Sequence, residues 1–333
     1  MTTIEEFSRL RLGNQGRRTQ IVAASIGIAG FALFIVSFLT NETHAAQSYL
    51  FSYTFWFSLP LGALGILLMN HVVGGRWGIA TRRLLEAAIR TLPLMVILFL
   101  PLLIGMKDLY SWTHPEMVRQ DVVLQHRQPY LNEAFFLIRT LLYFVIWLVL
   151  GFTLLVMSRH QDASGDRSMI RRMRMISAPG LILFTLSGTF AYIDWILSID
   201  AHFFSTVYGA MILAGQFLQT FAWIIIVLVV VGRQFKMESP LDPQLFLDLG
   251  NMMFCFLILW AYLSLSQLII VWPGNLPAEI TWYLDRTRGG WKLLAAFIAI
   301  ALFTLPFLLL LSRSRKKNAN ALVRVCVVIL IAR

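Results

Sequence analysis

The sequence has little charge and few residues of the kinds that bind metals or cofactors. Of its 333 residues only 14% are charged, and it has two cysteines and six histidines. About 25% of the residues of a typical soluble domain are charged, so the composition excludes an ordinary water-soluble protein. The two cysteines stand apart inside apolar segments, and CxxC, CxxCH and phosphate-binding glycine motifs are missing. We therefore expect this chain by itself to hold no haem, iron–sulfur cluster, structural zinc or nucleotide.

Long apolar segments make up most of the sequence. A helix needs about 20 apolar residues to cross a membrane, whereas a membrane strand needs about 10 and alternates in polarity. The segments have helical length and no alternation, so the sequence predicts an all-α, polytopic integral membrane protein. Eight full spans are predicted, at residues 20–40, 51–72, 87–106, 134–157, 178–199, 205–231, 248–271 and 291–311.

The remaining residues complete the predicted domain organisation. A ninth apolar segment begins near Leu322 and is cut off at Arg333, so we expect a truncated ninth span and a chain that continues further. Residues 1–19 form a polar N-terminal tail, and residues 20–333 form a single transmembrane domain. The first span is long for a signal peptide and lacks a clear cleavage site, which favours an uncleaved anchor.

The net charge of +11 is a topology signal, and it does not indicate nucleic-acid binding. If the N-terminus is cytoplasmic, the inner segments hold nineteen Lys and Arg residues and the outer loops hold five. Cytoplasmic loops of membrane proteins carry this excess of basic residues. The sequence therefore predicts a multi-pass membrane protein with a cytoplasmic N-terminus and the lipid bilayer as its surroundings.

Ionisable residues inside the predicted spans are candidate functional groups, because burying one in a membrane costs about 2.5–3.5 kcal/mol. Glu86 and Arg90 are four residues apart at the inner end of the third span, and a surface pair reaching the interface explains them. His71, at the inner end of the second span, is explained by a hydrogen bond at a helix end. Arg139 and Asp194 lie at similar depth on consecutive spans, so we expect them to pair, either structurally or as part of a proton relay.

The seventh span carries a polar stripe. Asp248, Asn251, Cys255, Tyr262 and Ser266 recur at helical spacing, interrupted by an apolar stretch at Ile258 and Leu259. Such a stripe predicts either a helix–helix interface with its polar groups facing inward or a path for protons. In the second interpretation the candidates form an inner set and an outer set separated by an apolar plug. The inner set is Glu86, Asp248 and Asn251, and the outer set is Arg139, Asp194, Tyr208 and Gln267, with His71, Arg90 and Tyr262 as further candidates.

Three stretches resemble a known family. They are FWFSLPLGALGILLMNHVVGGRWG at 55–78, TFAYIDWILSIDAHFFSTVYGAMILAGQ at 189–216, and WAYLSLSQLIIVWPGNLPAEITWYLDRTRGGW at 260–291. These residues are similar to ActF, the quinone-binding subunit 2 family of alternative complex III. The resemblance extends over nearly all of the chain, although members of that family have ten spans.

The resemblance implies an NrfD-like fold of helix bundles in a quinol:cytochrome c oxidoreductase of the respiratory chain, located in the bacterial inner (plasma) membrane. The implied partners are an NrfD-like sister membrane subunit, an iron–sulfur subunit, and multihaem and monohaem cytochrome c subunits. The cofactors, haem c and iron–sulfur clusters, lie in those partners, and menaquinol or ubiquinol is the substrate of the complex. In the sister subunit a membrane histidine near the outer side helps hold the quinol. Here the comparable segment is Ser58-Leu59-Pro60, which implies a non-catalytic role in scaffolding and proton translocation.

Two other functions remain open from the sequence. A direct quinone-binding subunit needs a polar head-group site, for which Asp200, His202 and Tyr208 are the candidates. A free-standing secondary transporter would show inverted repeats with helices broken at matching positions. Several prolines lie in or near spans, but they form no matched pair of breaks.

Overall fold

The computed structural model describes residues 13–40, 42–166, 168–234, 242–274 and 276–333, and within these ranges it contains helices and no strand. The predicted tail at 1–19 lies largely outside the described residues. The helices of the bundle are α2 (Gly13–Thr40), α3 (Glu42–Val73), α4 (Arg76–Ile89), α5 (Leu92–Ile104), α9 (Glu133–Ser164), α10 (Ser168–Trp195), α11 (Tyr208–Gln234), α12 (Pro243–Gly274) and α17 (Ala319–Ala332). One further span is made of three consecutive elements, α14 (Trp291–Ile298), the π-helical η4 (Ala299–Thr304) and α15 (Leu305–Leu311).

Seven of the described helices are long and apolar enough to cross a membrane, and an eighth span is obtained when α4 and α5 are counted together. Each of the eight predicted spans overlaps one of these, so a polytopic helical membrane protein is the architecture. The predicted ninth segment forms α17, an apolar helix shorter than the others.

The third predicted span is broken. Instead of one helix at 87–106, α4 and α5 meet at an angle of 41°. Pro93 stands in the first turn of α5, and because proline has no N–H it cannot continue the hydrogen-bond ladder of α4. Arg90 is the C-terminal cap of α4 and is exposed at the break.

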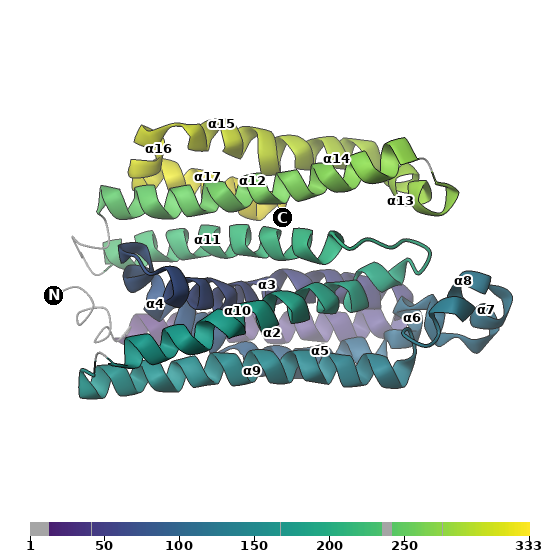
Figure 1. The fold of residues 1–333 in the computed structure, drawn as a ribbon, viewed down its shortest axis with the longest axis horizontal. Helices are drawn as coiled ribbons and strands as arrows, with labels where there is room; N and C mark the ends of the chain where they lie inside the picture. Colours follow the sequence, from purple (N-terminus) through teal and green to yellow (C-terminus); the bar gives the residue numbers. More distant parts are fainter. Residues whose placement is uncertain (1–12, 41, 167, 235–241, 275) are drawn as a thin grey trace.

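The spans run side by side along the long axis of the molecule, and short elements cover its two ends (Figure 1). α4 and the short α16 (Arg313–Lys317) lie at one end, which we name the α4 end. The other end, the α7 end, carries α6 (Met106–Leu109), η1 (Ser111–Thr113), α7 (Pro115–Gln120), α8 (Val122–Arg127) and α13 (Pro277–Thr287), with η2 (Leu197–Ile199) between α10 and α11.

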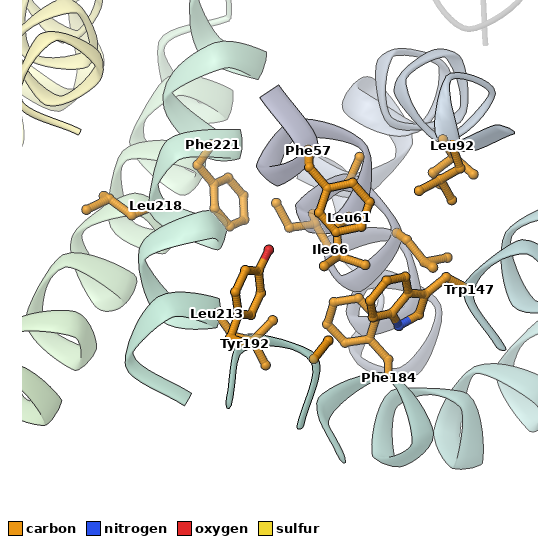
Figure 2. Packing of buried hydrophobic residues seen from close by; sticks show 14 of the residues in the cluster. Phe57, Leu61, Ile66, Leu92, Trp147, Phe184, Tyr192, Leu213, Leu218 and Phe221 are labelled. Carbon is orange, nitrogen blue, oxygen red and sulfur yellow. The ribbon is translucent and has the colours of Figure 1, made fainter. Parts of the chain in front are cut away.

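Two helices organise the packing. α3 packs against α4, α10 and α11, and α11 in turn packs against α10, α12 and α17. Figure 2 shows Phe57, Leu61 and Ile66 of α3 between Phe221 of α11 and Trp147 of α9. These five side chains are completely or almost completely buried, so α3 forms the centre of the apolar core.

Large aromatic side chains fill the core between α3, α5, α9 and α10. Trp195 contacts Phe57, Phe99, Phe144 and Trp147, with ring centroids 4.7–5.8 Å apart. The contacts include stacked and edge-on pairs, which aromatic rings prefer. We name this group of five rings the aromatic layer.

In contrast, α2 packs loosely. No residue in the apolar part of this helix is fully buried, Phe34 and Phe38 are half-buried, and a groove of about 870 Å³ lies between the helix and α3 and α5. Its lining is mostly apolar, as expected of a surface that contacts lipid chains.

Candidate functional site

A buried ion pair joins α9 and α10 near the α7 end. The guanidinium of Arg139 donates to both carboxylate oxygens of Asp194, with Nε–Oδ2 and Nη2–Oδ1 distances of 2.8 and 3.0 Å. The hydroxyl of Tyr143 donates to Oδ2 at 2.7 Å. Asp194 is fully buried and Arg139 is 7% exposed, so the predicted pairing of these two residues is confirmed.

The surrounding residues hold the pair in place. Arg139 and Tyr143 are four apart on α9 and share a helix face. Arg139 also donates to the carbonyl of Tyr130 at 2.8 Å, and its Cζ lies 3.8 Å from the centroid of the Tyr130 ring. Burial and the charge of Asp194 raise the pKa of Tyr130 to about 12, so its hydroxyl stays protonated even well above neutral pH. We name Tyr130, Arg139, Tyr143 and Asp194 the Asp194 cluster.

A second buried carboxylate lies near the α4 end. Glu86 is 2% exposed and accepts from Arg82 at 2.9 Å and from Arg83 at 2.7 Å. Ser158 of α9 also donates to Glu86. The predicted pair of Glu86 with Arg90 is therefore wrong: the partners are the arginines three and four residues before Glu86, and Arg90 lies at the helix break.

This Glu86 cluster extends across the ends of α4 and α9. Arg82 donates to Ser158 at 2.6 Å and to Gln161 at 2.9 Å, and Arg83 also pairs with Asp162. His71 lies close enough to interact electrostatically with Arg82 and Glu86. Two arginines thus face two carboxylates, which leaves the cluster close to neutral.

The two clusters lie toward opposite ends of α9, and buried apolar residues lie between them, including Phe144 and Trp147 of the aromatic layer. Tyr143 and Ser158 are fifteen residues apart on α9, which corresponds to about 22 Å at 1.5 Å per residue. The buried α9 residues between them are mostly apolar. One polar contact interrupts this stretch, a 2.9 Å hydrogen bond from Trp147 Nε1 to Ser187 Oγ.

The remaining outer candidates form a separate group. Ser205 Oγ donates to Gln267 and accepts from the backbone N–H of Tyr208 at 3.2 Å. The Tyr208 ring packs edge-on against Trp282 of α13, which in turn stacks on Phe203 at 4.9 Å. Tyr208 and Gln267 therefore stabilise the α10–α11 loop against α12 and α13, and they do not contact the Asp194 cluster.

The predicted quinone-binding residues have local partners. Asp200 accepts from the backbone N–H groups of His202 and Phe203 at 3.2 and 3.4 Å. His202 Nε2 lies 2.7 Å from Asp121 Oδ2, and Asp121 also caps α8. Asp200 thus orders the loop itself and His202 joins it to α8, while a cavity of about 270 Å³ near the loop is lined by Arg127, Tyr130, Leu131, Ile193, Leu197, Ser198, Phe203 and Phe204. Quinone binding at this loop stays a prediction.

The polar stripe of α12 does not face inward. Asn251 and Cys255 are exposed and Tyr262 is 65% exposed, whereas Met253 and Leu257 on the opposite side are completely buried. Asp248, at the end of the stripe, accepts from Gln244 at 3.1 Å. The predicted inward interface within this chain is therefore wrong, and Asp248 and Asn251 do not join Glu86. The plug predicted at Ile258 and Leu259 is exposed as well.

Several members of the clusters were missed by sequence reasoning. Tyr143 stands one helical turn from Arg139, and Arg82 and Arg83 stand one turn before Glu86, so helical spacing was the available signal. Ser158 and Asp162 belong to a distant segment and carry no such signal. Among the described residues, no three His, Cys, Asp or Glu side chains are grouped so that they could hold a metal ion. Neither a protein-family model nor a curated protein matches this chain.

Proposed function

We propose that the chain is a membrane core subunit of a bacterial quinol:electron-acceptor oxidoreductase of the alternative complex III type, with an NrfD-like fold. In this proposal a sister subunit oxidises the quinol, and iron–sulfur and haem c subunits carry the electrons. This chain acts as a scaffold and moves protons across the plasma membrane, with its N-terminus and the α4 end in the cytoplasm. The resemblance at residues 55–78, 189–216 and 260–291 supports the choice of family.

One structural observation supports a role in proton transfer. The Glu86 cluster and the Asp194 cluster each hold a buried carboxylate with arginine and hydroxyl partners, at opposite ends of one bundle. Chains of hydrogen-bonded carboxylates and hydroxyls are the usual groups of proton relays in membranes. The buried apolar residues of α9 between the clusters supply the barrier that a coupled pathway needs, because an open path would dissipate the proton gradient.

The test is quinol-driven turnover by the intact complex in liposomes. Electron transfer and proton release are measured for the wild type, Asp194→Asn and Glu86→Gln, after haem content has verified assembly. We expect electron transfer to persist while the ratio of protons to electrons falls. Asp285→Asn is the matched control, because Asp285 is 70% exposed and pairs with an exposed Arg288. An unchanged ratio of protons to electrons in both variants would show that the two clusters have only a structural role.

A second experiment tests membership of the complex. Deleting the chain should abolish co-purification of the haem and iron–sulfur subunits. A chain that purifies alone, stable and free of haem subunits, would instead favour a free-standing transporter. Binding of a quinone analogue to the complex, lost with Phe203→Ala at the cavity beside the α10–α11 loop, would favour a direct quinone-binding subunit.

A further inference from the structure

Three residues of the polar stripe of α12 are exposed and have no polar partner in the described part of the chain. Asn251, Cys255 and Tyr262 are four and seven residues apart on one face of the helix. Their polar groups make no hydrogen bond with any residue in the described part of the chain, and all three are exposed. A helix turns about 100° per residue, so this face points away from Met253, whose Sδ contacts Cys326 Sγ of α17 at 3.8 Å.

Other outward faces of the bundle differ from this stripe. On α9 the exposed side chains within the span include Ile138, Leu141, Val145, Val149 and Val156. Such a face suits hydrocarbon. The α12 face has an amide, a thiol and a phenol where α9 has branched aliphatic groups.

Tyr262 lies too deep for its hydroxyl to reach water. It is fourteen residues from Asp248 and ten from Trp272, which corresponds to about 21 Å and about 15 Å along the helix. Tyrosines that anchor a helix at a membrane surface sit at the interface instead. A hydroxyl without a partner in hydrocarbon loses its hydrogen bonds to water and gains none in return.

We infer that this stripe docks a transmembrane helix of a different membrane chain. That helix supplies hydrogen-bonding groups to Tyr262 and Asn251 and a basic side chain near Asp248. The inference rests on the proposed function in one respect, because it identifies the partner as the sister membrane subunit.

Charge argues against a second copy of this chain as the partner. Two copies in one membrane have the same orientation, so α12 would pair with α12 in parallel. A two-fold axis places each residue of such a pair opposite itself, and Asp248 would then face Asp248. Its hydrogen-bond partner in this chain is the neutral side chain of Gln244, which does not compensate the repulsion between the two carboxylates.

The test is photocrosslinking in native membranes. Tyr262 is replaced with p-benzoylphenylalanine, and the same residue at Val149 on the apolar face of α9 is the matched control. We expect Tyr262 to give one adduct, mapped by mass spectrometry to a transmembrane segment of another multi-span chain with a Lys or Arg at its cytoplasmic end. Val149 should give no protein adduct. An adduct with a second copy, or none, would overturn the inference.

A complementary measurement leaves the stripe intact. Cys255 should react with a membrane-permeant maleimide at least tenfold more slowly in native membranes than in the separated chain reconstituted in liposomes, while the buried Cys326 reacts slowly in both. Equal rates at Cys255 would show that nothing covers the stripe. A mapped adduct with a membrane chain that brings down no haem would support the interface and contradict the proposed function, so the two failures are distinguishable.

Discussion

Within the Asp194 cluster, the guanidinium and the carboxylate depend on each other. Removing one partner of a buried ion pair leaves the other charge buried and uncompensated, which costs about 3–5 kcal/mol. Arg139 also donates to the Tyr130 carbonyl, whereas Asp194 has no second cation among its described partners. The two residues therefore act as one unit in the stability of the bundle.

The first prediction concerns this pair. Asp194→Leu should lower the free energy of unfolding by about 3–5 kcal/mol, and Arg139→Met with Asp194→Leu should recover part of the loss because no lone charge remains. Thermal unfolding in detergent measures both variants. The exposed pair of Asp285 and Arg288 is the control, since breaking an exposed pair costs about 1 kcal/mol or less. Additive losses in the double variant would contradict the coupling.

The second prediction is a pH dependence at the α7 end. Partial desolvation raises the pKa of Asp121, but the N–H groups of Leu124 and Val123 and the neighbouring His202 outweigh it and hold the pKa below its usual value. A carboxylate with a lowered pKa stabilises the folded state above its unfolded pKa, and the stabilisation disappears as the pH falls through the folded pKa. We expect α8 to loosen below about pH 4.

Hydrogen exchange of the peptide at 121–127, corrected for the intrinsic rate at each pH, measures this change. Asp121→Asn is the matched control, because asparagine caps a helix nearly as well and does not titrate. The control should show no step in protection across the same pH range. A step of equal size in both proteins would assign the change to another group.

At the scale of helices, close contacts between neighbouring spans depend on glycine. A Cβ at Gly209, the second residue of α11, would lie 2.4 Å from the carbonyl oxygen of Thr189 on α10. Because that oxygen belongs to the backbone of a packed helix, it cannot move aside without shifting α10.

The third prediction follows from this contact. Gly209→Ala should lower the free energy of unfolding by about 1–3 kcal/mol, the usual cost of overpacking. Gly27→Ala on α2 is the matched control, since a Cβ at Gly27 meets no atom within 4 Å and alanine favours helix. Equal or higher stability of Gly209→Ala would show that α10 and α11 are free to separate.

The positions of the helices along the chain could largely be predicted from the sequence. Which face of each helix packs against its neighbours could be predicted less well. Length and hydropathy located every span because the requirement for an apolar segment acts on each helix separately. The break at Arg90 was not predicted, although Pro93 was visible, because proline is tolerated inside membrane helices as well as at their ends. Helical spacing placed Asn251 and Tyr262 on one face, but it contains no information on which neighbours that face meets.

The same reasoning explains which parts of the site were predicted. Arg139 and Asp194 were paired correctly from their depths on consecutive spans, since each charge needs an opposite charge at its own level. Glu86 was paired wrongly because Arg82, Arg83 and Arg90 all lie within reach of it in sequence. Arg90 is exposed at the break after α4, whereas Arg82 and Arg83 meet Ser158 of α9 together with Glu86.

At the scale of the whole molecule, the arrangement of spans separates two groups of loops. Arg171, Arg172 and Arg174 follow the α9–α10 turn, at the same end of the bundle as α4. The loop with His202 lies at the opposite end, beside α8. The orientation of the two ends in the membrane is predicted from the distribution of basic residues.

The fourth prediction tests that orientation. A single cysteine introduced at Asp166 in a Cys255→Ser, Cys326→Ala background should be protected from an impermeant maleimide in intact cells. A cysteine at His202 in the same background should react. Permeabilised cells are the control, in which both sites should be labelled. The reverse pattern would place the N-terminus outside and exclude the cytoplasmic assignment of the Glu86 cluster.

The loose attachment of α2 has a consequence for how the protein can be handled. No residue of its apolar part is fully buried, and its main contact is with α3, where the ring of Phe34 lies 4.5 Å from that of Tyr49, so most of the apolar core forms without α2. A fluorescent or affinity module placed before α3 would then report on insertion without disturbing either ionic cluster. The same independence makes this helix the segment that can be exchanged between related sequences, as a modular anchor, at little cost to the folding of the remainder.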